Sequence, residues 1–476
     1  MSTILEDVFN PGKFRENGHR VIDMLADYLE GTRNGKIQTV LPWKKPEEML
    51  SQCREDFAKP WDNEASFFSF IEEVIAKSIH LHHPKYVGHQ VVPPVPMAAL
   101  VETVEALLNN SMAVYEVGPY SSGLEKIVTD WLARRLGMDE QAAGILTSGG
   151  TIGNLTGLLA ARQHQANYNI WEEGTRSDAR LAVMVPAESH YSIARAVKIM
   201  GLGEQGVVKI PVNDRMQVEL LMLEKTFREA VREGKQVFAV AANACSTSTG
   251  SYDPIDAISR FCKENNLWLH VDGAHGGGAV LTQKYKHLVK GIEHADSVVI
   301  DFHKMLLCPA LTTAVIFKNG DNAYETFSQK ASYLLSQEKK GNWFDIAQRT
   351  LECTKKMMGI KVYALLKLYG EELFDEYITR TYDLAREFAG MIKKAPEFEL
   401  ALEPESNIVC FRYVPDGSNE TDLNGINLEC CDKIKEDGEF YIVKTTIHDK
   451  VYLRTTLMNP FTTTKELTEL LEKIRS

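Results

Sequence analysis

The sequence lacks a long hydrophobic run, a surplus of basic residues and a recognisable secretion signal. No apolar stretch approaches the roughly 18–20 residues that a membrane-spanning helix needs. The first residues, MSTILEDVFN, lack the basic start and the apolar centre of a signal peptide. The formal net charge is −12, so the chain offers no excess of positive charge to nucleic acid or to an acidic membrane. We therefore expect neither a membrane protein nor a nucleic-acid-binding protein.

The cysteines also lack the spacing of a disulfide framework or a zinc site. There are eight, none belongs to a CxxC pair, and Cys430 and Cys431 are adjacent. Structural zinc sites use closely spaced pairs of ligands, and disulfide frameworks are typical of small secreted proteins. The sequence therefore predicts reduced thiols, no metal site and a cytoplasmic location.

Short, continuous apolar runs alternate with helical stretches through the middle of the chain, and each run ends in a polar or glycine-rich turn. The runs occupy residues 145–146, 181–185, 237–241, 267–271 and 297–300. Strands that are apolar on both faces are typical of parallel sheets covered by helices on both sides. We therefore predict an α/β fold with a mainly parallel sheet.

The N-terminal part has a different pattern. Residues Phe14 to Glu30 place apolar side chains at helical spacing, which predicts an amphipathic helix. Pro42 and Pro46 then break the pattern and predict an extended arm. Because the apolar face of the helix has to be buried, we expect the arm to pack against a second subunit in a homodimer.

The last part of the chain is mostly helical after about Gly359, with strand-like runs at 408–413 and 451–453. This mixture is typical of a small α+β domain. The predicted organisation is an N-terminal helical arm over 1–85, a large domain over 86–360 and a small domain over 361–476.

Polar and reactive side chains follow the apolar runs, where the carboxyl ends of parallel strands form one edge of the sheet and bind ligands. Taken one at a time, each has an ordinary structural explanation as a tight turn, a helix cap, a packed histidine or a solvated charge. Lys304 is the hardest to explain as a solvated charge, because the apolar residues 305–307 follow it. In chain order the candidates are Ser148, Gly149, Gly150, His190, Thr247, Asp272, Ala274, Asp301, His303 and Lys304.

Pyridoxal phosphate requires this combination of groups. Its aldehyde reacts with a lysine amine, which Lys304 supplies. Its pyridine nitrogen needs a carboxylate such as Asp272, so that the ring stays protonated and accepts electrons. His190 and Ala274 suit the two faces of the ring, and the turn at 148–150 offers backbone N–H groups at a helix start for the phosphate. The residues by themselves thus predict a pyridoxal-phosphate enzyme.

The longer motifs around these residues resemble one family. HVDGAHGGG at 270–278 is followed by DFHK at 301–304, and TSGGTIGNL at 147–155 and LRTTLMNP at 453–460 match as well. Together they resemble the group II pyridoxal-dependent amino-acid decarboxylases, which act on glutamate, 2,4-diaminobutyrate, cysteine sulfinate or aromatic amino acids. The resemblance implies a fold-type I homodimer with its active site near the subunit interface. It also implies that an L-amino acid loses its carboxylate as CO2 and becomes an amine.

The resemblance implies a role for each cofactor residue. Lys304 matches the Schiff-base lysine, and Asp272 matches the partner of the pyridinium nitrogen. His190 matches the imidazole that is stacked on the ring, near the carbon that is protonated after CO2 leaves. The other implied contacts are Ala274 beneath the ring, Thr247 beside the ring oxygen, and Gly149, Gly150 and His303 near the phosphate.

Two further residues are implied for the substrate. Arg454 matches an arginine that binds the substrate carboxylate in the glutamate-like branch. His89 stands where glutamate decarboxylases have glutamine, as in the diaminobutyrate-like branch. Together Arg454 and His89 favour a substrate with a polar or acidic side chain.

The sequence departs from the family pattern at Asp301 and Phe344. Asp301 replaces an asparagine and brings a negative charge near the expected phosphate. Phe344 aligns with a tyrosine that donates a proton from a mobile loop, here about 333–346, and a phenylalanine there can favour oxidative deamination to an aldehyde. Alternatively, another hydroxyl such as that of Tyr333 donates the proton and Phe344 only packs.

Other functions therefore remain open alongside a decarboxylase. One is an aldehyde synthase or another fold-type I enzyme that uses the same cofactor. Another is a relative without catalytic activity, although the intact Lys304, Asp272 and His190 argue against it.

Overall fold

A computed structural model describes residues 3–53, 57–61, 63–176, 178–327 and 343–476. Contacts between residues divide the chain into two units. The first comprises Met1–His89, Gly390–Ala401 and Cys410–Ser476, and the second comprises Gln90–Ala389 and Leu402–Val409. Among the described helices, none combines the length and the apolar character needed to cross a membrane.

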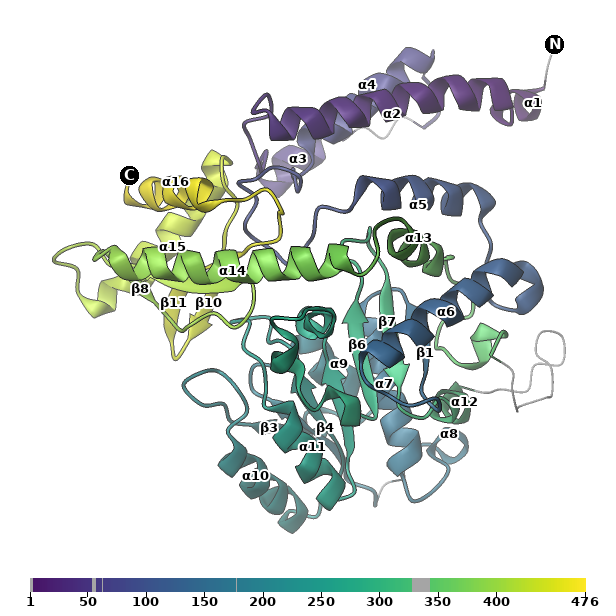
Figure 1. The fold of residues 1–476 in the computed structure, drawn as a ribbon, viewed down its shortest axis with the longest axis vertical. Helices are drawn as coiled ribbons and strands as arrows, with labels where there is room; N and C mark the ends of the chain where they lie inside the picture. The colour runs from purple at the N-terminus through teal and green to yellow at the C-terminus, as the bar shows by residue number, and fades with distance from the viewer. Residues whose placement is uncertain (1–2, 54–56, 62, 177, 328–342) are drawn as a thin grey trace. The chain divides into compact units, whose positions relative to one another are not determined.

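A seven-stranded sheet forms the centre of the second unit (Figure 1). Its strand order is β1-β7-β6-β5-β4-β2-β3. The pairs β2–β3, β2–β4, β4–β5 and β5–β6 are parallel, while β7 runs antiparallel to both β1 and β6. The mainly parallel sheet predicted from the apolar runs is therefore confirmed. The strands are β1 (Ala143–Thr147), β2 (Leu181–Pro186), β3 (Val207–Ile210), β4 (Gln236–Asn243), β5 (Trp268–Asp272), β6 (Ser297–Asp301) and β7 (Thr313–Phe317).

Helix α7 (Gly150–Gln165) packs closely on this sheet. Gly157 makes the close approach possible, since a Cβ at this position would lie 2.6 Å from Cε1 of His270 on β5. Helix α7 begins just after β1 ends, so the N-terminus of the helix lies at the carboxyl edge of the sheet. The other helices of the second unit are α5 (Pro96–Leu108), α6 (Pro119–Arg135), α8 (Ile170–Glu173), α9 (Tyr191–Ile199), α10 (Leu220–Arg232), α11 (Ile255–Glu264), α12 (Asp321–Phe327) and α13 (Gly359–Tyr369).

The first unit begins with four helices and also holds a smaller sheet. The four strands have the order β10-β11-β9-β8, and the pairs β8–β9 and β10–β11 are antiparallel. The strands predicted at 408–413 and 451–453 are both present. The elements are α1 (Ile4–Val8), α2 (Pro11–Arg33), α3 (Pro46–Gln52), α4 (Glu64–Lys77), β8 (Phe398–Leu400), α15 (Glu420–Asp437), β10 (Val443–Ile447), β11 (Lys450–Thr456) and α16 (Thr464–Arg475). Strand β9 (Ile408–Tyr413) and helix α14 (Glu372–Lys394) have residues in both units.

Proline has a different effect in the N-terminal helices from the one predicted. The helix predicted over Phe14–Glu30 is present as α2, but the prediction of an extended arm is wrong for Pro46–Gln52, which form α3. Both helices start on a proline, Pro11 in α2 and Pro46 in α3. The first helical position tolerates proline because its missing N–H would have no partner inside the helix.

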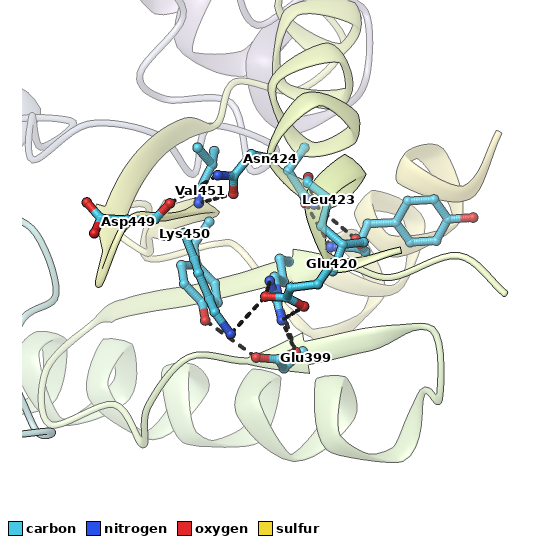
Figure 2. Close-up of polar contacts among 11 residues, drawn as sticks. Glu399, Glu420, Leu423, Asn424, Asp449, Lys450 and Val451 are labelled. Carbon is cyan, nitrogen blue, oxygen red and sulfur yellow. Dashed lines mark hydrogen bonds and ion pairs between the residues drawn. The ribbon is translucent and has the colours of Figure 1, made fainter. Parts of the chain in front are cut away.

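A buried arginine joins α15 to the small sheet (Figure 2). Arg412 on β9 is 3% exposed, and its guanidinium lies 2.7 Å from Glu399 and 2.9 Å from Glu420. Lys450 contacts the same Glu420 carboxylate at 2.8 Å. Hydrogen bonds from Arg412 and then Lys450 lower the pKa of Glu420 to about 2. A buried guanidinium is tolerated only when it is paired, so the two glutamates hold this corner of the unit together.

Candidate active site

The carboxyl ends of the large sheet surround a cavity of about 270 Å³. The polar groups that line it follow β1, β2, β4, β5 and β6, where the sequence predicted reactive side chains. The predicted cofactor residues are all brought together here, namely Ser148, Gly149, Gly150, His190, Thr247, Asp272, Ala274, His303 and Lys304.

Lys304 extends into this cavity from the turn after β6. Its Nζ lies 3.1 Å from Oδ2 of Asp301, which is itself 3% exposed. Burial alone lowers the pKa of the lysine, but the carboxylates of Asp301 and Asp272 outweigh it and raise the pKa. Oγ1 of Thr313 on β7 donates to the Asp301 carboxylate at 2.5 Å and fixes its orientation. The aspartate that departs from the family pattern thus contacts the candidate lysine directly.

Asp272 is the last residue of β5 and is 7% exposed. Its carboxylate accepts hydrogen bonds from Nδ2 of Asn154 at 2.9 Å and from the backbone N–H of Ala274 at 3.1 Å. One donor lies on α7 and the other in the turn that follows β5, so two fixed groups orient the carboxylate. The sequence reasoning did not select Asn154, although it lies in the motif at 147–155 as the second polar side chain of α7, after Thr151.

His190 caps the N-terminus of α9, and its Nδ1 accepts a hydrogen bond from the backbone N–H of Ser192 at 3.3 Å. Oγ of Ser192 lies 2.8 Å from the same nitrogen. Burial lowers the pKa of His190 more than the nearby Asp272 raises it. The imidazole that lines the cavity is therefore neutral at physiological pH.

The turn between β1 and α7 is suited to an anion. Gly149 has a φ of 104°, a conformation that residues with a Cβ rarely adopt, and it directs the chain into the first turn of α7. The N–H groups of a first helical turn have no partner inside the helix and bind phosphate groups well. The backbone N–H of Ser148 donates to Glu352 at 3.1 Å, so a phosphate contact from Ser148 would have to come from its hydroxyl.

The proposed substrate residues His89 and Arg454 belong to the first unit. The ring centroid of His89 lies 5.5 Å from that of Tyr441, and Arg454 on β11 is 5% exposed. Burial lowers the pKa of His89 first, and the positive charge of Arg454 lowers it further. The two residues are therefore neighbours, with Arg454 buried and His89 still open to solvent over part of its surface.

Phe344 packs against aromatic neighbours and is not among the described residues that line the cavity. Its ring centroid lies 5.5 Å from that of Tyr115 and 5.8 Å from that of Trp343. Tyr333, and the part of the predicted loop up to residue 342, lie outside the described residues. The role of Phe344 stays a prediction.

A cavity lined by a lysine, a carboxylate, an imidazole and a helix N-terminus, on a mainly parallel sheet, defines the class of fold-type I pyridoxal-phosphate enzymes. The chemistry of these donors fits the aldehyde, the pyridine nitrogen, the ring face and the phosphate of that cofactor. The chain's similarity to known proteins agrees with this class and narrows it to one family.

The family described as the pyridoxal-dependent decarboxylase conserved domain matches residues 46–414. L-2,4-diaminobutyrate decarboxylase from Acinetobacter baumannii is 29% identical over 473 residues, covering 94% of this chain and 92% of that protein. Human cysteine sulfinic acid decarboxylase is 30% identical over 383 residues, covering 79% and 77%. The crystal structure of mouse CSAD is 25% identical and has a TM-score of 0.85, with coverage of 95% and 98%.

The chain belongs to the pyridoxal-dependent decarboxylase family. It is an amino-acid decarboxylase, and its cofactor is pyridoxal phosphate. The activity and the cofactor expected from the sequence motifs are thus confirmed.

Proposed function

We propose that this decarboxylase acts on an L-amino acid with a polar or acidic side chain and releases the corresponding amine and CO2. The observation that carries this proposal is the buried Arg454 beside His89. A buried guanidinium binds a carboxylate strongly, because its planar donors match the two oxygens. The names of the relatives acting on diaminobutyrate and cysteine sulfinate support the same substrate class.

A panel of L-amino acids tests the substrate class. It contains glutamate, aspartate, cysteine sulfinate, 2,4-diaminobutyrate, phenylalanine, tyrosine and tryptophan, with CO2 release and amine identity measured for each. We expect kcat/KM for one of the polar or acidic substrates to exceed that for every aromatic one by at least about a hundredfold, the size of about 2.7 kcal/mol. A preference for an aromatic substrate would contradict the proposal.

We assign the reaction roles as follows. When bound, pyridoxal phosphate supplies an electron sink for the electron pair left behind by CO2. Lys304 would hold its aldehyde, Asp272 would keep its ring nitrogen protonated, and the turn from Ser148 to Gly150 would bind its phosphate. His190 is neutral and carries one ring proton, which suits it to hold a proton near the carbon that has lost CO2.

The replacement of the loop tyrosine by Phe344 favours an aldehyde as a second product. We expect Phe344→Tyr to lower the ratio of aldehyde to amine by about tenfold, because a hydroxyl there protonates the carbon before oxygen reacts with it. Amine, aldehyde and cofactor loss are measured in air and under nitrogen. Tyr115→Phe is the matched control, since it changes the neighbouring ring without adding a donor. If the product ratio and the rate of inactivation do not change, Phe344 only packs.

We propose that the protein is a homodimer with its active site near the subunit interface. Helix α2 buries only Gly31 and Thr32 in this single chain, although it is amphipathic. Monomers rarely leave such broad apolar faces in water. The large apolar side chains exposed on the N-terminal helices are Ile4, Leu5, Val8, Phe9, Phe14, Ile22, Leu25, Leu50, Phe67, Phe70 and Val74, and those on α5 are Met97, Leu100, Val104, Leu107 and Leu108.

Deleting residues 1–60 is expected to give insoluble or monomeric protein without activity, because the arm would then bury no surface of a partner. Light scattering coupled to gel filtration measures the mass, and CO2 release measures activity. A pair of single substitutions distinguishes the loss of an interface from misfolding. Phe14→Asp on the exposed apolar face should weaken the dimer, whereas Glu16→Gln on the same helix should not. A truncated protein that remains a soluble and active dimer would show that the arm is not needed.

We also propose a cytoplasmic location and the functional division at residues 85 and 360. None of the eight cysteines forms a disulfide, which supports a reducing compartment.

A further inference from the structure

A chain of buried hydrogen bonds connects the two candidate catalytic groups of the cavity, Asp272 and His190. The amide of Asn154 on α7 is at its centre. Its Nδ2 donates to Oδ2 of Asp272 at 2.9 Å and to Oγ of Ser192 at 3.0 Å. Oγ of Ser192 lies 2.8 Å from Nδ1 of His190. One side chain, 1% exposed, therefore contacts Asp272 directly and reaches His190 through a single hydroxyl.

From Asn154 the hydrogen bonds continue to two residues of the large sheet, His270 on β5 and Ser297 on β6. Oδ1 of Asn154 is 3.0 Å from Nε2 of His270, and Nδ1 of His270 is 2.8 Å from Oγ of Ser297. Nε1 of Trp268 donates to the same hydroxyl at 2.8 Å. His270 and Ser297 are both fully buried, so these bonds have no competition from water. The missing side chain of Gly157 leaves the space in which the His270 ring lies.

The groups at the two ends of this series, the Asp272 carboxylate and the Trp268 indole, determine which atom is the donor in each hydrogen bond. A carboxylate only accepts, so Nδ2 of Asn154 faces Asp272 and Oδ1 faces His270. His270 must then carry its proton on Nε2, and since burial lowers its pKa to about 4, its Nδ1 is an acceptor. Ser297 donates to that nitrogen and accepts from the indole N–H of Trp268, which can only donate.

The same reasoning extends to the catalytic imidazole. Ser192 uses its oxygen lone pair for Asn154, so its hydroxyl proton points to Nδ1 of His190. The backbone N–H of Ser192 also donates to this nitrogen. Nδ1 of His190 is therefore an acceptor, and the one proton of the neutral ring is on Nε2. This is the tautomer required if His190 is to offer a proton from that nitrogen in the cavity.

We propose that Asn154 is a positioning residue that orients the Asp272 carboxylate and, through Ser192, selects the tautomer of His190. The inference rests on the roles proposed above for Asp272 and His190. Substitutions at two different points of this series of hydrogen bonds separate the branch that leads to Asp272 from the branch that leads to His190. Removing the amide of Asn154 weakens the hydrogen bonding of both groups, whereas removing the hydroxyl of Ser192 weakens only that of His190.

The first test compares Asn154→Leu with a control on the same helix. Leucine has a similar size and no donors, so the Asp272 carboxylate loses one of its two donors. We expect the Kd of the apoprotein for pyridoxal phosphate, measured by titration of the visible absorption band, to rise about tenfold. Thr156→Val is the matched control, because Thr156 is fully buried on α7 and its hydroxyl has no hydrogen bond within the described residues. A Kd of Asn154→Leu equal to that of Thr156→Val would overturn the proposal.

Ser192→Ala tests the second branch. We expect it to leave the cofactor Kd within about twofold of the unaltered protein and to lower kcat about tenfold with little change in KM. The reason is that His190 loses the shorter of the two bonds that select its tautomer, while Asp272 keeps both of its donors. An unchanged kcat would remove the link to His190.

Asn154→Asp keeps the proposal testable even if the leucine variant does not fold. It has the same shape and still accepts from His270, but it places a second carboxylate against Asp272. Like charges at this distance raise the pKa of one partner, so a proton is taken up as the pH falls and one donor is restored. We expect the loss of cofactor affinity, relative to the unaltered protein, to be large at about pH 8 and to shrink towards about pH 6. A loss of affinity independent of pH would point to a packing defect and overturn the proposal.

The cofactor Kd and absorption spectrum are measured without substrate. If the unaltered protein releases CO2 from no amino acid in the panel, the proposed function fails while these measurements still judge the role of Asn154.

Discussion

Lys304→Ala is expected to lower the rate of CO2 release by at least about a thousandfold while the chain still folds. Lys304 is the one lysine among the described residues that line the cavity, and alanine offers no amine to the cofactor. Borohydride reduction of the unaltered protein, followed by peptide mapping, should locate the phosphopyridoxyl group on Lys304. Finding the group on another lysine would refute the assignment.

Two further variants separate the chemistry of Lys304 from its effect on stability. In Lys304→Ala the buried carboxylate of Asp301 loses its cation at 3.1 Å, so the thermal unfolding temperature should also fall. Lys304→Arg keeps a positive charge there but has no amine that can react, so it should be inactive and more stable than the alanine variant. Lys286→Ala, at an exposed lysine, should match the unaltered protein in both measurements.

Asp272→Asn is expected to lower kcat by about two to three orders of magnitude, the size of the roughly 2.7–4 kcal/mol lost with a preorganised electrostatic partner. The variant keeps the size of the side chain but removes the charge that holds the pyridine nitrogen protonated. Cofactor affinity should therefore fall much less than the rate. Single-turnover CO2 release and cofactor titration measure the two effects separately.

A carboxylate elsewhere on the same sheet provides the control for this variant. Asp296 precedes β6, at the edge away from the cavity, and accepts the backbone N–H of Leu269 at 2.8 Å. Asp296→Asn should cost some stability and leave kcat within a few-fold. A near-normal rate in Asp272→Asn would contradict the role assigned to Asp272.

The strands and the cofactor residues were largely predictable because their signals are local. A strand buried on both faces shows as a continuous apolar run, as in β2 and β4, and the motif that follows it stands at the carboxyl edge wherever the strand lies in the sheet. This is why Lys304, Asp272 and His190 could be placed at one site before the structure was known. Strand β7 was not predicted. Its apolar run is short, and no local feature of the sequence indicates that this strand lies between β1 and β6 and runs antiparallel to both.

By itself the sequence determined the class of enzyme, the cofactor and a set of candidate cofactor residues, all of which line one cavity. Only the tertiary structure decided the partners of those residues. Asn154 lies 118 positions before Asp272 and 38 before Ser192, so no local pattern indicates that one amide serves both. Asp301 was expected near a phosphate, and only the structure shows that it also contacts Lys304 and Thr313. The physical reason is that the burial of a strand shows in the local sequence as a run of apolar residues. A buried polar group, in contrast, pairs with whichever residue the fold places within hydrogen-bond distance, and that residue can be far away in the sequence.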